Sequence, residues 1–319
     1  MSKWLTRKKL IIGLLSVIFF ILIGYSSYLY LNFKATMEAI HNPISNEENT
    51  NAVASNDTPL LVKPQKQESV TPSPITLLLL GIDQVEDTPG RADTILVLTI
   101  NPETESMKML SIPRDTYTEI IGLDFSDKIN HSYAFGGMQM AHATVENLLQ
   151  IPIDYVVTIN MEGFKELVDL LDGVEVENEW AFSNWGYDFP KGSLTLTGEE
   201  ALSYVRMRKE DPQGDFGRQI RQRLIVESLL EELSSLNLVW QVPSILKMIR
   251  DHSETNITFD EIKQMSKYYK PALNNIEQLH FKEGEGRMEN KIWYYFPSES
   301  ELNSIREQLK SSLSTKQES

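Results

Sequence analysis

The sequence predicts an α/β or α+β fold, in which a central mixed sheet is covered by helices on both faces. Short apolar runs of strand length alternate with longer segments whose apolar residues recur every three or four positions. Because strands and helices interleave along the chain, helices are expected on both sides of the sheet. The 319 residues are enough for one large domain or two small ones once the N-terminus is set aside.

The expected strands are short, apolar and bounded by turn residues: Ile75–Ile82, Thr94–Ile100, Met107–Ile112, Tyr155–Ile159, Val174–Glu177, Gln278–Phe281 and Lys291–Phe296. The expected helices show helical periodicity: Gly137–Gln150, Glu162–Leu171, 197–206, Ile220–Leu236, Val239–Ile249, the run after Thr258, and Glu299–Leu313. Two helix starts are marked by capping boxes, Thr197 with Glu200 and Thr258 with Glu261.

Residues 10–33 contain no charged side chain, and the residues before them are basic: Lys3, Arg7, Lys8 and Lys9. As a helix, this run would extend about 36 Å, sufficient to cross a bilayer. The basic residues predict a cytoplasmic tail at 1–9 and an external remainder, as in a single-pass type II protein of the cell membrane. A cleaved signal peptide would be shorter and end in a small-x-small site, whereas this run ends in YSSYLYLNF. A retained transmembrane signal anchor is therefore predicted.

Residues 34–73 are rich in Asn, Ser, Pro, Glu and Gln and show no sustained apolar period. This composition is typical of a flexible linker. We therefore expect an extracellular stalk at 34–73, followed by a folded extracellular domain over residues 74–319.

The net charge is −15, and because the first nine residues contribute +4, the remainder carries −19. A domain so acidic is not expected to bind nucleic acid, and a basic cluster within it is correspondingly notable. The absence of cysteine excludes disulfides, thiolate zinc sites and a thiol nucleophile.

The basic cluster lies at Ala201–Arg223 and holds five arginines and Lys209. An extended VRMR segment would place Arg206 and Arg208 on one face, because side chains alternate along a strand. Beyond the turn residues DPQGD, a second group shares a helix face: Arg218, Arg221 and Gln222. Cations facing each other across a turn suit pyrophosphate, whose oxygens guanidinium binds bidentately. The residues alone leave a salt-bridged, solvated helix surface equally open.

Two carboxylates flank one loop, since Asp83 follows the first strand and Asp93 precedes the second. Two oxygen ligands with room for water and phosphate are what Mg²⁺ requires, and Mn²⁺ is the other ion considered. The alternative is that Asp83 caps a turn and Asp93 pairs with Arg91.

Two further polar clusters follow expected strands. Arg114 lies within SIPRDT, and the segment KINHSYAFGG offers Lys128 before a glycine-rich helix start, where backbone amides favour anions. His131 in that segment is either a base or ligand, or a residue that holds a loop in place. No nucleophile elbow, Walker loop or dinucleotide fingerprint occurs.

In chain order, the motifs GID, GRADT, SIPRDT, KINHSYAFGG and YVRMRKEDPQGDFGRQIRQ resemble those of the LytR-CpsA-Psr family. The resemblance runs from about Pro74 to the C-terminus and includes the short tail and the single anchor. It implies an α-β-α catalytic domain outside the membrane of a Gram-positive type of envelope.

The resemblance also implies roles for individual residues. Asp83 and Asp93 would bind Mg²⁺, and the pyrophosphate of a polyprenyl-linked glycopolymer would be surrounded by Arg91, Arg114, Lys128, Arg206, Arg208, Arg218 and Gln222. Asp93 is the candidate for assisting deprotonation of the attacking hydroxyl, and Arg114 is the catalytic cation beside it. The polyprenyl tail would lie in an apolar pocket whose lining the sequence does not distinguish from ordinary core.

The implied reaction transfers an anionic glycopolymer of the teichoic acid type to a peptidoglycan sugar hydroxyl, in the family the 6-hydroxyl of N-acetylmuramic acid, and forms a phosphodiester. One alternative is a polyprenyl pyrophosphate hydrolase, which would use the same residues. The other is a non-enzymatic, membrane-bound attenuator of transcription, against which the acidic external domain without a helix-turn-helix pattern argues. Clustered cations should also repel one another in the absence of ligand.

Overall fold

The computed structural model describes residues 2–44, 72–84, 90–208, 210–234 and 241–314. The central sheet has the strand order β11-β6-β1-β2-β3-β12. Its strands are β1 (Ile75–Asp83), β2 (Arg91–Asn101), β3 (Ser106–Ser111), β6 (Tyr155–Asn160), β11 (Ser253–Thr255) and β12 (Ile276–His280). β1 pairs with β6, and β3 with β12, in parallel, whereas the other neighbours are antiparallel. The predicted mixed sheet is therefore confirmed.

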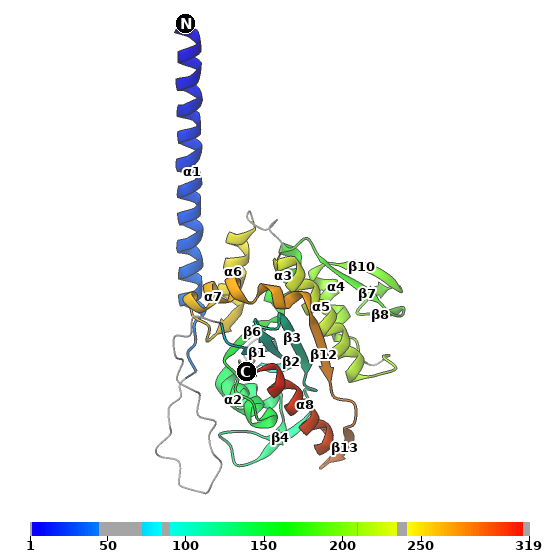
Figure 1. The fold of residues 1–319 in the computed structure, drawn as a ribbon. Coiled ribbons are helices and arrows are strands. Elements are labelled where there is room, and N and C mark those ends of the chain that lie inside the picture. Colours follow the sequence, from blue (N-terminus) through cyan, green and yellow to red (C-terminus); the bar gives the residue numbers. More distant parts are fainter. Residues whose placement is uncertain (1, 45–71, 85–89, 209, 235–240, 315–319) are drawn as a thin grey trace.

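Helices cover both faces of this sheet (Figure 1). One face carries α2 (His131–Leu149) and α8 (Glu299–Ser312). The other carries α3 (Met161–Leu170), α4 (Gly198–Arg206), α5 (Asp215–Ser234), α6 (Val242–His252) and α7 (Phe259–Tyr268). Because side chains alternate along a strand, each face has its own core: Leu78, Leu80 and Val97 belong to the first, and Leu77, Leu79 and Leu98 to the second.

Small two-stranded sheets outside the central sheet complete the domain. They are β4 (Tyr117–Glu119) with β5 (Ser126–Lys128), β7 (Val174–Asn178) with β10 (Gly192–Leu196), β8 (Phe182–Asn184) with β9 (Tyr187–Phe189), and β13 (Glu285–Glu289) with β14 (Ile292–Phe296). A 3₁₀ turn, η2 (Lys270–Asn274), precedes β12. Of these elements, only β7 and β14 carry an apolar pattern long enough to be predicted.

Both predicted capping boxes are present. The backbone amide of Thr197 donates to the Glu200 carboxylate at 2.9 Å, and that of Thr258 donates to Glu261 at 3.0 Å. The expectation of an extended VRMR segment is wrong, because α4 continues to Arg206 and the chain becomes extended at Met207. The helix continues because Val205 packs into the core that α4 shares with α5 and α6. Arg206 is thus the last residue of α4, and the buried Met207 separates it from Arg208.

The first helix, α1 (Ser2–Ile40), extends away from the domain as a single long rod (Figure 1). It continues seven residues past the predicted anchor, so residues 34–40 are helical rather than part of a flexible stalk. This segment is held as a helix because Thr36, Met37 and Ile40 are buried against the domain. Most of the predicted stalk, residues 45–71, lies outside the described residues. No helical stretch among the described residues is both long and apolar enough to span a membrane.

Candidate active site

A β-bulge positions the two predicted carboxylates. Along the β1–β2 pair, Gly81 lies opposite Thr94 and Ile82 opposite Ala92, so Asp93 is an extra residue without a partner. A bulge of this kind redirects a side chain. Ala92 belongs to the core beneath α2 and α8, whereas Asp93 and Asp83 both face a cavity on the opposite side of the sheet.

That cavity has a volume of about 490 Å³ and lies between the sheet and the helices of the second face. Most of its wall is apolar, with Leu79 and Val157 from the sheet, Val226 and Leu230 from α5, and Ile249 from α6. The polar part of the lining includes five of the predicted site residues: Asp83, Asp93, Arg206, Arg218 and Gln222. An apolar chamber with a charged, guanidinium-rich portion suits an amphiphile that has an anionic head.

Ion pairs hold the cations in place. The Arg206 guanidinium lies 2.8 Å from Asp83, and Arg218 lies 2.8 Å from Asp215, three residues earlier in α5. Arg114 pairs with Asp93, which also accepts a 3.0 Å hydrogen bond from the Asn130 amide. The alternative considered for Asp93, a pair with Arg91, is therefore not the one formed, because Arg114 is its partner. The expected mutual repulsion of the cations is also offset, because each of these arginines is paired with a carboxylate.

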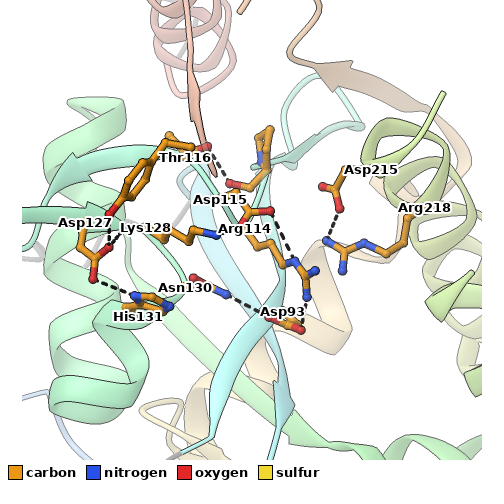
Figure 2. Close-up of polar contacts among 12 residues, drawn as sticks. Asp93, Arg114, Asp115, Thr116, Asp127, Lys128, Asn130, His131, Asp215 and Arg218 are labelled. Atoms are coloured by element: carbon orange, nitrogen blue, oxygen red, sulfur yellow. Dashed lines mark hydrogen bonds and ion pairs between the residues drawn. The ribbon is translucent and has the colours of Figure 1, made fainter. Parts of the chain in front are cut away.

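Arg114 and Arg218 reach toward each other from different elements, Arg114 from the turn after β3 and Arg218 from α5 (Figure 2). Burial alone would lower the pKa of Arg114, but the surrounding carboxylates Asp93, Asp115 and Asp215 together raise it. Burial lowers the pKa of Arg218, the Asp215 carboxylate opposes this, and the nearby charge of Arg114 lowers it further. Of these two facing cations, Arg218 is thus the one whose charge is less compensated.

Unused hydrogen-bond donors point to a missing ligand. The buried Nε of Arg218 and that of Arg114 have no hydrogen-bond partner among the described residues. A buried donor without an acceptor costs about 1–3 kcal/mol, and the cost is larger for a charged group. Oxygen atoms of an anion bound at this end of the cavity would remove that cost.

Lys128 belongs to a second layer of the site. Its ammonium group lies 2.6 Å from Asp115, which also faces Arg114 (Figure 2). His131 lies beyond it and pairs with Asp127 at 2.7 Å. Neither Lys128 nor His131 lines the cavity among the described residues. This arrangement favours the interpretation that His131 holds its loop in place.

Arg91 and Arg208 are two predicted residues that do not line the cavity within the described part of the chain. Both are exposed, and no ion pair of either is seen within the described part of the chain. Arg91 lies opposite Asp83 in the β1–β2 pair, and the charge of Arg208 acts on Arg218. Lys209, the remaining cation of the basic stretch, lies outside the described residues.

The last two arginines of the stretch are structural. Arg221 donates to Asp211 at 2.6 Å, to the Tyr204 carbonyl at 3.0 Å and to the Met207 carbonyl. Arg223 donates to Gln278 at 2.9 Å and to Ser111 at 2.8 Å. Gly217 is needed beside Arg221, because a Cβ there would lie 2.0 Å from the Asp211 carboxylate. These side chains form the buried support for the helix that carries Arg218.

Sequence reasoning missed the carboxylates that orient the cations, Asp115 and Asp215, although both lie inside the quoted motifs. It also missed Trp185, which is 58% exposed at the tip of the β8–β9 hairpin. The Arg206 guanidinium lies 5.2 Å from the centre of its ring. The aromatic-rich composition of 177–191 was the available signal, but it did not single out one residue.

The donor chemistry at Asp83 and Asp93 fits Mg²⁺ only with help from a substrate. The described residues contain no cluster of three or more metal-ligating side chains. Two carboxylates on one cavity wall are hard oxygen donors, and Mg²⁺ completes such a set with water and phosphate oxygens. Each of the two carboxylates is neutralised by an arginine, so this pair would hold the ion together with phosphate.

This is an α-β-α domain with an apolar cavity and a guanidinium-rich, carboxylate-bearing portion, a combination that suits an anionic amphiphile. The comparison with known sequences is more specific. The chain belongs to the LytR-CpsA-Psr family, whose sequence model (LytR_cpsA_psr family) matches residues 27–311.

Relatives within this family have names and structures. TagU of Bacillus subtilis (strain 168), the polyisoprenyl-teichoic acid–peptidoglycan teichoic acid transferase, is 41% identical over 311 residues, which cover 96% of this chain and 97% of TagU. The crystal structure of B. subtilis TagU is similar with a TM-score of 0.64 and 44% identity, and covers 77% of this chain and 99% of its own. A structure of TagT bound to LIIa-WTA gives a TM-score of 0.67 at 29% identity, covering 79% of this chain and 95% of its own.

Proposed function

We propose that this protein transfers a teichoic-acid-type glycopolymer from a polyprenyl pyrophosphate carrier to a hydroxyl of peptidoglycan. The observation that carries the proposal is the cavity, whose apolar walls end at Asp83, Asp93, Arg206, Arg218 and Gln222. A polyprenyl chain matches the walls, and a pyrophosphate matches the guanidinium groups. The transferase names of relatives that align over nearly the whole chain support the same reaction.

In the proposed reaction, the acceptor hydroxyl attacks the phosphorus next to the glycopolymer. A new oxygen–phosphorus bond forms, the anhydride bond breaks, and polyprenyl phosphate leaves with the bridging oxygen. The hydroxyl proton passes to Asp93 or to water. The anhydride provides the driving force, and the chain contributes positioning and charge neutralisation by preorganised cations.

Ligand binding exchanges the partners of the paired charges. In the free site, Arg206 pairs with Asp83 and Arg114 pairs with Asp93. Pyrophosphate oxygens bind the two guanidinium groups and so release the two carboxylates, whose oxygens are then free to hold Mg²⁺ or to accept the proton. When bound, Mg²⁺ supplies neutralisation of the charge on the phosphoryl oxygens. Net charge in the site is thus kept close to balance before and after binding.

Measuring the release of polyprenyl phosphate with and without peptidoglycan tests this function against the hydrolase alternative. Transfer predicts that the acceptor accelerates release and that phosphodiester-linked product accumulates. Release that is equally fast without acceptor, with no linked product, would identify the protein as a hydrolase.

For the N-terminus we propose a retained single-pass anchor at residues 10–33, with residues 1–9 in the cytoplasm and the domain outside. The support is the uncharged run and the basic residues that precede it. N-terminal sequencing of the mature protein tests retention, and protease treatment of intact protoplasts tests the side of the membrane. A mature N-terminus beyond about residue 25, or a protected domain, would contradict the topology.

A further inference from the structure

The end of α1 is packed into the catalytic domain rather than suspended above it. Thr36, Met37 and Ile40 are 1%, 3% and 6% exposed, although α1 is the element that projects from the molecule (Figure 1). The rings of Tyr30 and Phe33 lie 5.3 and 5.2 Å from that of Phe259 at the start of α7.

Hydrogen bonds fix the point where the chain leaves α1. The Asn42 backbone amide donates to the Thr255 carbonyl in β11 at 2.7 Å, and its side-chain amide donates to the Glu254 carboxylate at 3.2 Å. His41 forms a parallel bridge with Thr255. The helix end is therefore attached to the edge strand of the central sheet.

The packed face of α1 is also a wall of the cavity. Phe33, Met37 and Ile40 line it together with helices α5 and α6. Their spacing of four and three residues places them on one helix face, whereas Ala35 and Ala39 on the other side are exposed. Apolar side chains inside a ligand cavity contact whatever occupies it.

The preceding turns of α1 carry large exposed apolar side chains around the helix: Phe20, Ile21, Ile23, Tyr28, Tyr30 and Leu31. Exposed apolar side chains of this kind usually mark contact with lipid or a partner. These turns belong to the proposed membrane anchor, so the packed end of α1 adjoins the membrane from which a lipid carrier would come.

We propose that the last two turns of α1 are part of the lipid-binding site, where Phe33, Met37 and Ile40 contact the polyprenyl chain and select for its length. This inference rests on the proposed function, which places the lipid in the cavity. α1 contacts β11, and β6 separates β11 from β1, which carries Asp83. With neighbouring strands about 4.8 Å apart, this wall lies roughly 10–15 Å across the sheet from the carboxylates, within reach of a long tail and beyond a short one.

The test measures transfer by the full-length protein in lipid nanodiscs with two donors that share one glycopolymer pyrophosphate head. One donor has a long polyprenyl tail and the other has a geranyl tail. Met37→Trp fills the α1 side of the cavity, and Ala39→Trp adds the same ring to the exposed side of the same helix. We expect Met37→Trp to lower kcat/KM for the long-tail donor about tenfold, which corresponds to ~1.4 kcal/mol. Its kcat/KM for the geranyl donor should fall much less than that for the long-tail donor, and both activities of Ala39→Trp should match the wild type.

Three outcomes would overturn the inference in distinguishable ways. If the wild type prefers the long tail and Met37→Trp keeps that preference, α1 is only a tether. If the wild type shows no long-tail preference, the lipid does not occupy the cavity, and the proposed function fails with the inference. If both donors lose activity equally in Met37→Trp, the contact between α1 and the lipid is tested by photocrosslinking from p-benzoylphenylalanine at position 33. Crosslinking to the long-tail donor and not to the geranyl donor supports contact, and no crosslinking to either overturns it.

Discussion

Arg218 and Arg221 lie three residues apart on α5, and their surroundings differ completely. Arg221 donates to the Asp211 carboxylate and to the carbonyls of Tyr204 and Met207, and its guanidinium lies 5.2 Å from the centre of the Phe182 ring. Arg218 is equally buried, but it has one ion pair and a buried Nε without a partner among the described residues. Arg221 therefore uses its hydrogen-bond donors within the fold, whereas Arg218 has a buried donor for which the described residues provide no acceptor.

The difference shows that hydrogen-bond satisfaction separates the two roles where burial and charge do not. A buried cation with every donor used is held by the fold, and removing it leaves its carboxylate uncompensated. A buried cation with a free donor at a cavity has a stability cost that a ligand offsets. The same comparison assigns Arg223 to the first group. Arg114 shares one feature with Arg218, because its Nε lacks a hydrogen-bond partner among the described residues, although it lies 3.7 Å from Asp115.

Arg221→Gln tests the structural side of the comparison and should have the largest effect on stability. Breaking a buried ion pair by removing one partner costs about 3–5 kcal/mol. Denaturant unfolding of the purified protein measures this loss. The matched control is Arg250→Gln on α6, whose ion pair is exposed, and it should change stability by no more than about 0.5 kcal/mol. Equal effects of the two substitutions would remove the distinction.

Asp93→Ala and Asp83→Ala test the carboxylates that Arg114 and Arg206 hold in place. Both variants should fold and should lose Mg²⁺-dependent transfer by on the order of 100-fold or more, because several kcal/mol of transition-state stabilisation depend on the metal and its ligands. Initial rates with a Mg²⁺ titration after EDTA treatment measure this. Asp260→Ala, at an exposed position on α7, is the control. Full activity of either site variant with and without Mg²⁺ would show that the carboxylates are structural.

Arg218→Gln tests the ligand-binding side. The affinity for a polyprenyl pyrophosphate analogue should fall by about 1.5–3 kcal/mol, the range for a hydrogen bond to a charged group. Stability should fall much less than in Arg221→Gln, because burial already lowers the pKa of Arg218 and so disfavours its charged form in the fold. Calorimetric titration and melting curves on the same samples separate the two effects.

Arg218→Lys sharpens this experiment, since it keeps the charge and removes the planar fork. It should lose part of the affinity that Arg218→Gln loses. An affinity equal to that of the wild type in both variants would return Arg218 to the structural group.

The smallest expected effect concerns the second layer, where Asp127 pairs with His131 (Figure 2). Asp127 also accepts a 3.2 Å hydrogen bond from the Tyr294 hydroxyl. Burial raises the pKa of Asp127, but hydrogen bonds from His131, the Lys128 amide and Tyr294 lower it overall. A carboxyl whose pKa is lower in the folded state stabilises the fold above its unfolded pKa, and this contribution disappears as the pH falls through the folded pKa.

Asp127→Asn should therefore melt a few degrees below the wild type near pH 7, by less than about 4 °C, and the gap should close below about pH 4. Thermal melts across that range measure it. The exposed Asp124→Asn provides the control. A gap that stays constant with pH would show that Asp127 contributes through packing rather than through its charge.

The strands of the central sheet could be predicted from the sequence more completely than the contacts within the candidate site. The apolar runs Ile75–Ile82 and Tyr155–Ile159 became β1 and β6, because a strand buried on both faces is apolar throughout. The three-residue β11 could not be predicted, since it forms by pairing with β6 and has no pattern of its own. The end of α4 was misjudged because helical packing of Val205 outweighed the alternation of VRMR.

Within the site, the motifs identified the cations but not their partners. Asp83, Asp93, Arg206, Arg218 and Gln222 were predicted and meet at one cavity. Asp115 and Asp215 were missed because an ion pair depends on distances between elements, which spacing in the sequence does not give. The bulge at Asp93 was missed for the same reason, since it exists only in the register between β1 and β2. The packing of the end of α1 against the domain could not be predicted, because the composition from residue 34 onward is typical of a flexible stalk.

A structure of the protein with polyprenyl pyrophosphate bound tests the central claim most directly. We expect a pyrophosphate oxygen to accept a hydrogen bond from the Arg218 Nε, Arg221 to keep its bonds to Asp211, Tyr204 and Met207, and the tail to fill the cavity. A head group bound away from Arg218, or a tail lying outside the cavity, would contradict it.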